Sequence, residues 1–187
     1  GPLEDGEAEF RELSDDQAIC VGYANDIEAT NHLPVEQWLV VRLAKRLHAI
    51  RDERPELGLG PDGKVLILVE LDDATGRAPW RLAGFSCSLQ QKIASDEVAL
   101  HRAVRLAVEV ELKAAARGFP GLRPDLPDQL TVNGAGAFEV GGPEGDNGLS
   151  GKKLVVAAYG PRVPIGGGAW SGKDFFKADR AGGLHAR

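Results

Sequence analysis

The sequence predicts an α/β protein of the α+β kind: an open mixed sheet with two helices on one face, in a β-α-β-β-α-β repeat, plus half of a second similar domain. Two long segments carry apolar residues at helical spacing, and runs rich in β-branched residues lie between them. After residue 141 the chain is rich in glycine and contains one apolar run. We therefore expect an N-terminal arm with a short strand at 1–26, an α/β domain at 27–141 and a partial second domain at 142–187.

The first half of the α/β domain is predicted element by element. Residues 18–24 (AICVGYA) have the composition of a short strand. A helix is expected over 34–54, because Pro34 suits a first turn and six apolar residues recur every three or four positions after it. A glycine- and proline-containing turn at 60–63 should lead into a strand over 64–71.

The second half repeats the pattern. A half-buried strand is expected over 81–90, joined to the preceding strand by a hairpin loop at 72–79. The second helix is expected over 95–117, with Ser95 as its N-cap and Gly118 as its stop.

The chain after the second helix should complete the sheet and begin another one. Strands are expected over 129–132 and 137–140. In the tail, the sequence favours one strand over 154–158 and a helix starting near Lys173. One strand cannot bury both faces or satisfy both edges, so this tail needs another chain or a further segment.

Bulk composition narrows the class of protein. The chain of 187 residues is 43% hydrophobic, which is typical of a globular protein. It has no apolar run long enough to cross a bilayer, so no membrane partner is expected. Its net charge of −6 argues against nucleic acid as a partner. Two cysteines, Cys20 and Cys87, form no disulfide framework and favour a reducing, cytoplasmic location.

Charge is distributed unevenly along the chain. Residues 151–187 hold seven Lys/Arg against two Asp, a net of +5, whereas residues 1–150 have a net of −11. Glycines between the basic residues supply backbone N–H groups in tight turns, an arrangement that suits a polyphosphate. The alternative is a solvated basic face.

Other sequence motifs give less support to specific chemistry. Residues 167–173 (GGAWSGK) match the start of a P-loop, but Asp174 stands where a Ser or Thr would hold magnesium, and no solid strand precedes the motif. We reject a P-loop and keep the idea of a phosphate-binding turn. The four histidines have no metal-ligand spacing, and no C-x-x-C or G-x-S-x-G motif is present.

A longer set of ordered motifs resembles methionine adenosyltransferase, also called S-adenosylmethionine synthetase. The motifs cover residues 14–187, which correspond to the middle part of the family without its N-terminal and C-terminal thirds. They are DQ-x4-GYA at 16–24, LP at 33–34, PDGK at 61–64, F-x-V-GGP-x-GD-x-GLSG-x-K at 138–153 and YG…GGGA-x-SGKD-x2-K-x-DR at 159–180.

The resemblance implies an activity and its requirements. Family members transfer adenosyl from ATP to methionine, then release and hydrolyse triphosphate. They use Mg²⁺ and commonly K⁺, serve S-adenosylmethionine synthesis in one-carbon metabolism, and form homo-oligomers with active sites between subunits. We therefore expect ATP and methionine as ligands and another protein chain as partner.

The resemblance also implies roles for individual residues. The matching lysines would hold the triphosphate and act in catalysis, the matching acids would serve ATP, methionine and metal, and the aromatic residue would lie beside adenine. The catalytic positions are Lys64, Lys153, Lys173 and Lys177; the ATP and substrate positions are Asp16, Phe138, Asp146, Lys152, Gly167, Gly168 and Ala169; the metal position is Asp179.

Three departures from the family pattern keep alternatives open. Ala137, Ala157 and Ile165 stand where the family usually has arginine, aspartate and histidine. The chain is expected to be part of a working synthetase completed by another chain or a missing segment. The alternatives are a non-catalytic binding or regulatory relative, or a related enzyme acting on another nucleotide or sulfur compound.

Overall fold

The computed structural model describes residues 18–71, 79–92, 95–147, 156 and 158–187. The chain divides into two compact units. The glycine-rich unit comprises residues 1–34 with 150–187, and the sheet unit comprises residues 35–149. The domain boundaries expected from the sequence remain a prediction. The elements are η1 (Glu28–Thr30), α1 (Val35–Glu53), η2 (Pro55–Leu57), β1 (Leu59–Leu71), β2 (Trp80–Gln91), α2 (Glu97–Gly118), β3 (Gln129–Val132), η3 (Gly142–Glu144) and α3 (Ala178–Ala186).

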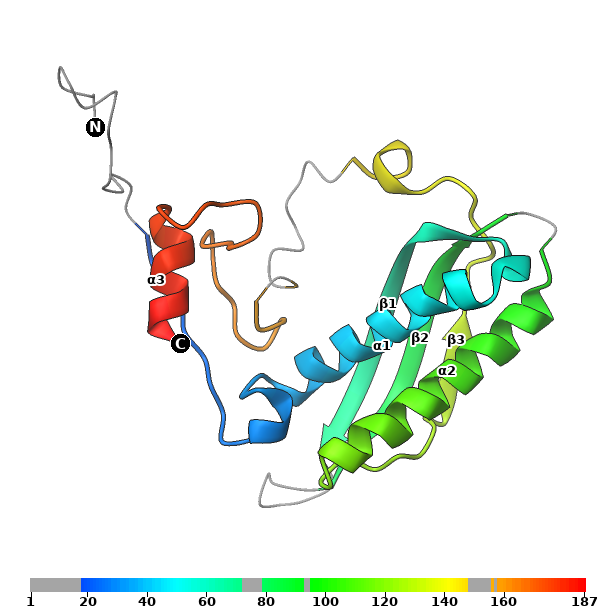
Figure 1. Ribbon diagram of the computed structural model, residues 1–187, viewed down its shortest axis with the longest axis horizontal. Helices are drawn as coiled ribbons and strands as arrows, with labels where there is room; N and C mark the ends of the chain where they lie inside the picture. The colour runs from blue at the N-terminus through cyan, green and yellow to red at the C-terminus, as the bar shows by residue number, and fades with distance from the viewer. Residues whose placement is uncertain (1–17, 72–78, 93–94, 148–155, 157) are drawn as a thin grey trace. The chain divides into compact units, whose positions relative to one another are not determined.

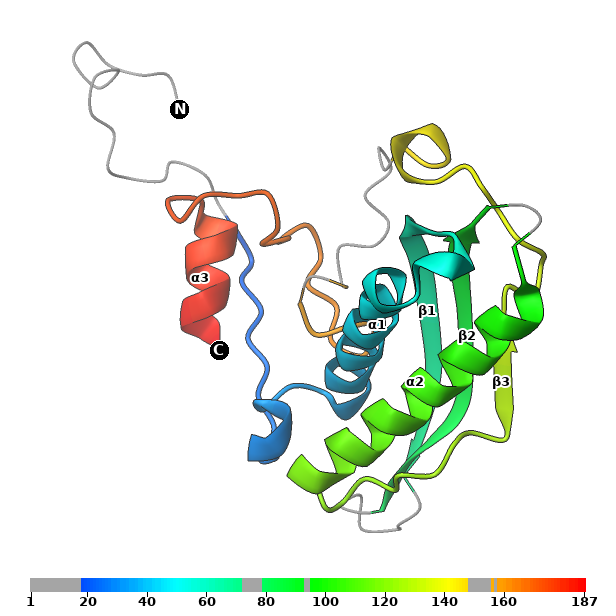
Figure 2. The ribbon, with the colours of Figure 1, turned by 45° about the vertical axis from the view of Figure 1, so that its right-hand side comes forward.

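The sheet unit has the predicted layered architecture. Its three strands lie in the order β1-β2-β3, with β1 antiparallel and β3 parallel to β2. Figures 1 and 2 show α1 and α2 lying across the same face of this sheet. The predicted mixed sheet with two helices on one face is therefore confirmed.

The core lies between the helices and the covered sheet face. Helical periodicity places the apolar stripes of α1 and α2 inward, and the alternation along β2 does the same for its apolar residues. The other sheet face remains open, with Leu66 67% and Leu68 57% exposed. The main buried residues are Leu39, Leu43, Leu47 and Ile50 of α1; Leu82, Phe85 and Cys87 of β2; and Leu100, Val104, Val108 and Leu112 of α2.

The two helices also contact each other through side chains near their surfaces. The Arg42 guanidinium bonds Glu111 at 2.6 Å and lies 5.1 Å from the ring centroid of Trp38. Trp38 in turn meets Phe119 edge-on, with ring centroids 6.0 Å apart. These contacts connect α1 to the end of α2, above the apolar core.

The ends of the second helix differ from the sequence prediction. Asp96, not Ser95, is the N-cap, and its carboxylate accepts a hydrogen bond from the Ala99 backbone N–H at 2.9 Å. The helix includes Gly118 as its last residue, one residue beyond the predicted end. Phe119 follows as the C-cap, and its side chain is buried. Burial of this aromatic residue fixes the helix end, which local sequence signals did not reveal.

The first strand is longer than predicted. β1 begins at Leu59, so the expected turn at 60–63 is wrong. Leu59 pairs with Gln91 and Gly63 with Leu89, which leaves three β1 residues opposite Gln90 alone. Gly60, Pro61 and Asp62 therefore form a bulge inside the strand. The hairpin loop expected at 72–79 lies outside the described residues except for its last residue, Pro79.

Two predicted strands are absent from the described residues. Residues 18–24 are in no strand and instead contact α3, where the Cys20 thiol donates to the Ala178 carbonyl at 3.4 Å. Residues 137–140 are in no strand either; Gln91 N–H donates to the Phe138 carbonyl at 2.9 Å before the chain enters η3. Of the strand expected at 154–158, only Val156 and Ala158 are described, and neither is in a strand.

The glycine-rich unit is built around aromatic residues and one short helix. Tyr159 is fully buried, with its ring centroid 5.8 Å from that of Tyr23 and 5.3 Å from that of Trp170. The final helix begins at Ala178, later than the predicted start near Lys173. Asp174 accounts for the delay, because its carboxylate accepts backbone N–H bonds in a turn that precedes the helix.

Candidate functional site

The predicted site residues fall into three groups. Six lie in the glycine-rich unit and three in the sheet unit, while the remaining three are outside the described residues. The first group is Gly167, Gly168, Ala169, Lys173, Lys177 and Asp179; the second is Lys64, Phe138 and Asp146; the third is Asp16, Lys152 and Lys153.

The glycine-rich loop, residues 166–172, is anchored to the aromatic core of its unit. Gly166 and Gly172 have φ values of 60° and 75°, which non-glycine residues seldom adopt. The Gly168 N–H donates to the Ile165 carbonyl at 3.2 Å and closes a turn. Ile165 and Ala169 are buried on either side of it. The core thus holds a tight turn whose outer side, at Gly166 and Gly167, faces solvent.

Lys173 and Asp179 contact each other directly. The Lys173 ammonium lies 2.5 Å from the Asp179 carboxylate, and the two side chains are 27% and 19% exposed. The Arg180 guanidinium donates to the Lys173 carbonyl, which further fixes the loop against the first turn of α3. Gly168 is close as well, since a Cβ built there would lie 3.7 Å from an Asp179 carboxylate oxygen. The fold therefore gathers three predicted site residues at one point.

Lys177, the other predicted lysine of the glycine-rich unit that the structure describes, lies in a different environment from Lys173. Lys177 is the residue before α3, with an extended backbone and an exposed side chain. Its backbone N–H bonds the Asp174 carboxylate at 3.2 Å. Phe175, between these two residues in the chain, is 64% exposed, with the Arg180 guanidinium 4.2 Å from its ring centroid. The loop after Lys173 thus presents cationic and aromatic groups together.

Metal binding gains no support from the described residues. Nowhere in the described part of the chain do three His, Cys, Asp or Glu side chains gather closely enough to share an ion. Asp179, the predicted metal ligand, instead has Lys173 as its partner. The ion pair engages one of the two carboxylate oxygens, so the role of Asp179 as a metal ligand stays a prediction.

In the sheet unit, Lys64 lies on the open side of β1. It is exposed and pairs in register with Ser88 of β2. Phe138 is half-buried beside the end of β2, where its carbonyl accepts from Gln91 N–H. Asp146 is exposed after η3, and its N–H donates to the Gly142 carbonyl at 2.8 Å. These three residues therefore lie on one end of the sheet and the segment that follows it.

Sequence reasoning missed two residues that connect this group. Gln90 bonds both Asp62 and Glu139, and the Asp62 carboxylate accepts from Gly142 N–H at 2.8 Å. The partners are 28 to 80 residues apart in the chain, so no local pattern could have identified them. The sequence shows the glycines at the contact points, Gly60 and Gly141, but it does not show which residues approach them.

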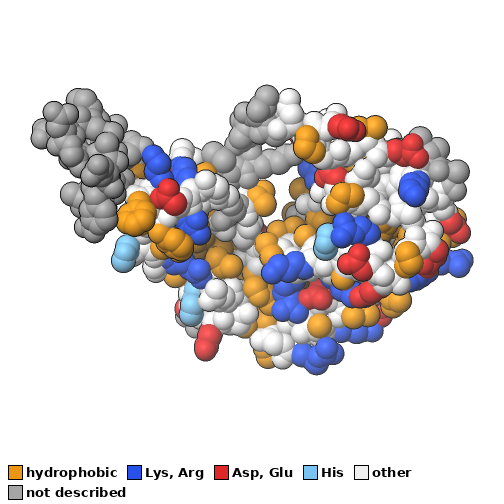
Figure 3. Space-filling model, turned by 45° about the horizontal axis from the view of Figure 1, so that its top comes forward, with side chains coloured by type: hydrophobic (Ala, Val, Ile, Leu, Met, Phe, Trp, Pro, Cys, Tyr) orange, Lys and Arg blue, Asp and Glu red, His pale blue; other side chains and the backbone are white. Residues whose placement is uncertain are grey.

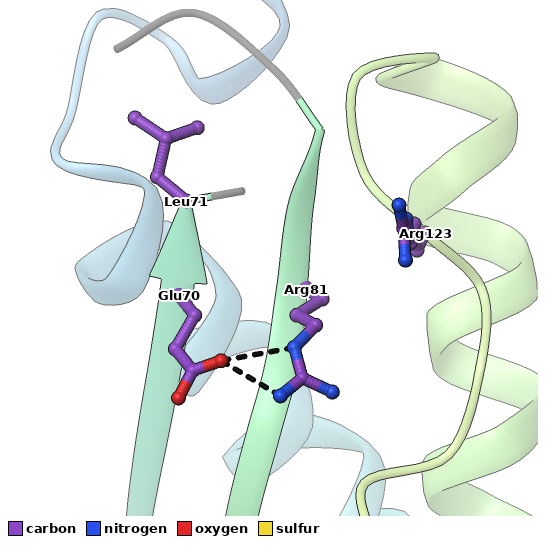
Figure 4. Close-up of a pocket in the computed structure, with 4 residues that line it drawn as sticks. All are labelled: Glu70, Leu71, Arg81 and Arg123. Atoms are coloured by element: carbon purple, nitrogen blue, oxygen red, sulfur yellow. Dashed lines mark hydrogen bonds and ion pairs between the residues drawn. The ribbon is translucent and has the colours of Figure 1, made fainter. Parts of the chain in front are cut away.

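One hollow of the sheet unit is lined by none of the predicted residues. It has a volume of about 490 Å³ and is lined by Glu70, Leu71, Arg81 and Arg123 (Figure 4). Arg81 bonds Glu70 at 2.8 Å, and hydrogen bonding to that carboxylate raises the pKa of the guanidinium. Asp128 approaches Arg81 at 3.6 Å from another side. The hollow thus lies at the end of the β1–β2 hairpin, and ion pairs between Arg81 and acidic residues line it.

Surface charge and helix composition add two observations. In Figure 3, the Lys and Arg side chains of the described residues lie among Asp and Glu side chains and apolar groups. The visible described surface therefore has no continuous basic area. No helix among the described residues is both long and apolar enough to span a bilayer.

Family models match almost the whole chain. The model described as S-adenosylmethionine synthetase, central domain, matches residues 11–138. The model described as S-adenosylmethionine synthetase, C-terminal domain, matches residues 140–187. Both halves of the chain therefore point to one family.

Individual relatives agree with the family models. An S-adenosylmethionine synthase of Corynebacterium jeikeium is 37% identical over 98% of this chain and 44% of its own length. One from Gloeobacter violaceus is 36% identical over 92% of this chain and 42% of its own. A solved structure, titled as an unusual S-adenosylmethionine synthetase from Campylobacter jejuni, has a TM-score of 0.67 at 22% identity, over 94% of this chain and 44% of that one. The chain spans less than half the length of these relatives.

Proposed function

Because the chain belongs to the S-adenosylmethionine synthetase family, we propose that it is part of an enzyme that transfers adenosyl from ATP to methionine. In this proposal the enzyme releases triphosphate and then hydrolyses it, and another chain or a further segment completes the active site. The observation that carries the proposal is the match at 36–37% identity across 92–98% of the chain, on both sides of residue 139.

The lysines would supply the charge that this reaction needs. Attack of the methionine sulfur on the 5′ carbon leaves negative charge on the departing triphosphate. Ammonium groups fixed in advance stabilise such charge, and each pair near 4 Å has a raw attraction of about 4 kcal/mol at an effective dielectric of 20. Among the described residues we assign this role to Lys64, Lys173 and Lys177.

The Lys173–Asp179 contact supports a positioned rather than a mobile lysine. Its ammonium group is held at 2.5 Å from the carboxylate beside the turn at Gly168. A lysine held in this way loses little side-chain freedom on binding an anion, which reduces the entropic cost of association. A bound triphosphate would have to share or take over the ammonium group.

The second group would bind the nucleoside end. We assign Phe138 to the adenine ring and Asp146 to ATP or methionine, as the family pattern implies. Asp16, Lys152 and Lys153 complete the proposed set from outside the described residues. Mg²⁺ and K⁺ belong to the proposal through the family, but the described residues do not form a metal site, so we assign no step to a metal ion.

Product formation tests this proposal. The purified chain should be incubated with ATP, methionine, Mg²⁺ and K⁺, alone and with a complementary chain that carries the rest of the family's length. Mass spectrometry should detect S-adenosylmethionine only in the mixture, since in this proposal the complementary chain completes the site. A demonstrated complex that forms no product would contradict the proposal.

Replacing one lysine gives a second test. Lys173→Ala should weaken binding of inorganic triphosphate about tenfold, because it removes one charge-assisted contact. Calorimetric titration measures the effect. Lys45→Ala, at an exposed position of α1, is the matched control and should leave the affinity unchanged.

One observation favours a second candidate function, a subunit that binds nucleotide but does not catalyse a reaction. Ile165, which stands where the family has histidine, is buried in the core formed by Ala158 and Tyr159. It therefore serves packing rather than polar chemistry. Nucleotide affinity without turnover in the assembled complex would favour this candidate over the enzyme.

A further inference from the structure

Gln90 lies at the centre of a network that connects the Lys64 strand to the Phe138 segment. Three β1 residues, Gly60 to Asp62, bulge outward opposite this one residue of β2. Its side-chain oxygen accepts the Asp62 N–H at 3.1 Å. The side chain thus replaces a ladder bond that the bulge removes.

The same side chain also bonds the segment after the sheet. Its amide nitrogen donates to the Glu139 carbonyl at 2.6 Å. On the neighbouring position of β2, Gln91 N–H donates to the Phe138 carbonyl at 2.9 Å. Two successive β2 residues therefore hold two successive residues of the segment.

Asp62 adds the second half of the network. Its carboxylate accepts the Gly142 N–H at 2.8 Å, at the start of η3. Asp62 lies two residues before Lys64, and Asp146 is attached to η3 through its bond to the Gly142 carbonyl. The strand that bears Lys64 is thus joined to the segment that bears Phe138 and Asp146 in two ways: directly through Asp62, and indirectly through Gln90 of β2.

Two glycines make room for this arrangement. A Cβ at Gly60 would lie 2.3 Å from the Gln90 amide, and one at Gly141 would lie 2.7 Å from the Asp62 Cβ. Both distances are shorter than the contacts that Cβ atoms make in real structures, so a side chain at either position would displace the Gln90 amide or Asp62.

We propose that Gln90 and Asp62 are positioning residues that set the spacing between Lys64 and Phe138, and thereby select a nucleoside triphosphate over bare triphosphate. This inference rests on the proposed function, in which Phe138 meets adenine and Lys64 meets phosphate. Of these two residues, a ligand that contains only the phosphates needs Lys64 but not Phe138. A ligand that also contains adenosine needs both residues at a fixed separation.

Gln90→Leu tests the inference, with Gln129→Leu, at an exposed glutamine of β3, as matched control. In the full chain, Gln90→Leu should lower ATP affinity about tenfold and leave inorganic triphosphate affinity within about twofold. The control should change neither. Equal losses for both ligands, or no loss for either, would overturn the inference.

A second pair of variants guards against misfolding. Asp62→Ala should reproduce the ATP-specific loss, whereas Asp62→Asn, which keeps an acceptor oxygen for Gly142 N–H, should restore most of the affinity. An equal loss in both Asp62 variants would count against the network.

Amide hydrogen exchange separates this inference from the proposed function. Exchange at Asp62 and Gly142 should become at least about tenfold faster in Gln90→Leu and Asp62→Ala respectively. If the unmodified chain binds neither ATP nor triphosphate, the selectivity inference fails together with the function. Unchanged exchange would show, independently of any ligand, that the two side chains do not hold the segment.

Discussion

The sheet unit and the glycine-rich unit are stabilised in different ways. The sheet unit combines two helices and three strands around long apolar stripes, so its backbone bonds are satisfied in regular ladders. Among its described residues, the glycine-rich unit has one helix longer than a single turn, α3, and a small aromatic core around Tyr159. Regular periodicity thus supports the first, whereas close glycine approaches and aromatic contacts support the second.

This contrast also separates structure from proposed chemistry. In the sheet unit, the proposed site residues lie on an open face and a following segment, away from the core. In the glycine-rich unit, Ile165, Ala169 and Trp170 of the core are continuous with the loop that carries the site. Core and site are therefore harder to change independently in the glycine-rich unit.

The largest expected effect is in the core of the sheet unit. Leu112 is fully buried, so Leu112→Ala should lower the free energy of unfolding by about 2–5 kcal/mol through lost burial and a cavity. Urea denaturation measures the change. Leu106→Ala, at a 58% exposed position of the same helix, is the control and should stay within about 0.5 kcal/mol.

The next effect concerns alkaline pH. Burial raises the pKa of the Cys87 thiol from its ordinary 9.0 to about 12. Above pH 9 the unfolded chain ionises this thiol and the folded chain does not, so stability should fall by about 1.4 kcal/mol per pH unit until about pH 12. Cys87→Ala should remove this part of the slope in unfolding curves recorded from about pH 8 to about pH 11. An identical slope in both proteins would contradict the assignment.

A helix cap provides a smaller effect and compares structure with sequence directly. Asp96→Ala should cost about 1 kcal/mol, because the Ala99 N–H loses its acceptor. Ser95→Ala should cost less, although the sequence pattern favoured Ser95 as the cap. Thermal unfolding of the two variants decides between them, and a larger loss for Ser95→Ala would support the sequence pattern.

The smallest effect tests the core of the glycine-rich unit. Within the described part of the chain, the buried Tyr159 hydroxyl has no hydrogen-bond partner. Tyr159→Phe should therefore be neutral or stabilising by up to about 1 kcal/mol, since it removes an unsatisfied polar group and keeps the ring contacts. Differential scanning calorimetry measures it, with Tyr23→Phe as control. A clear destabilisation would show that the hydroxyl has a partner.

Sequence by itself determined the sheet unit and the family. The spacing of apolar residues identified α1, α2, β1 and β2. Each of these elements buries one stripe or one face, so its apolar residues recur at the helical or strand period. Ordered motifs such as PDGK and SGKD identified the family because they preserve residue order without requiring knowledge of contacts.

Tertiary structure alone decided the remaining features. The bulge opposite Gln90, the Lys173–Asp179 pair and the approach of residues 18–24 to α3 depend on partners distant in the chain. Local sequence propensity does not depend on such distant partners. A short apolar segment therefore has the same sequence pattern whether it pairs in a sheet or contacts a helix. Long-range contacts therefore determine which local conformation forms where local propensity favours several about equally.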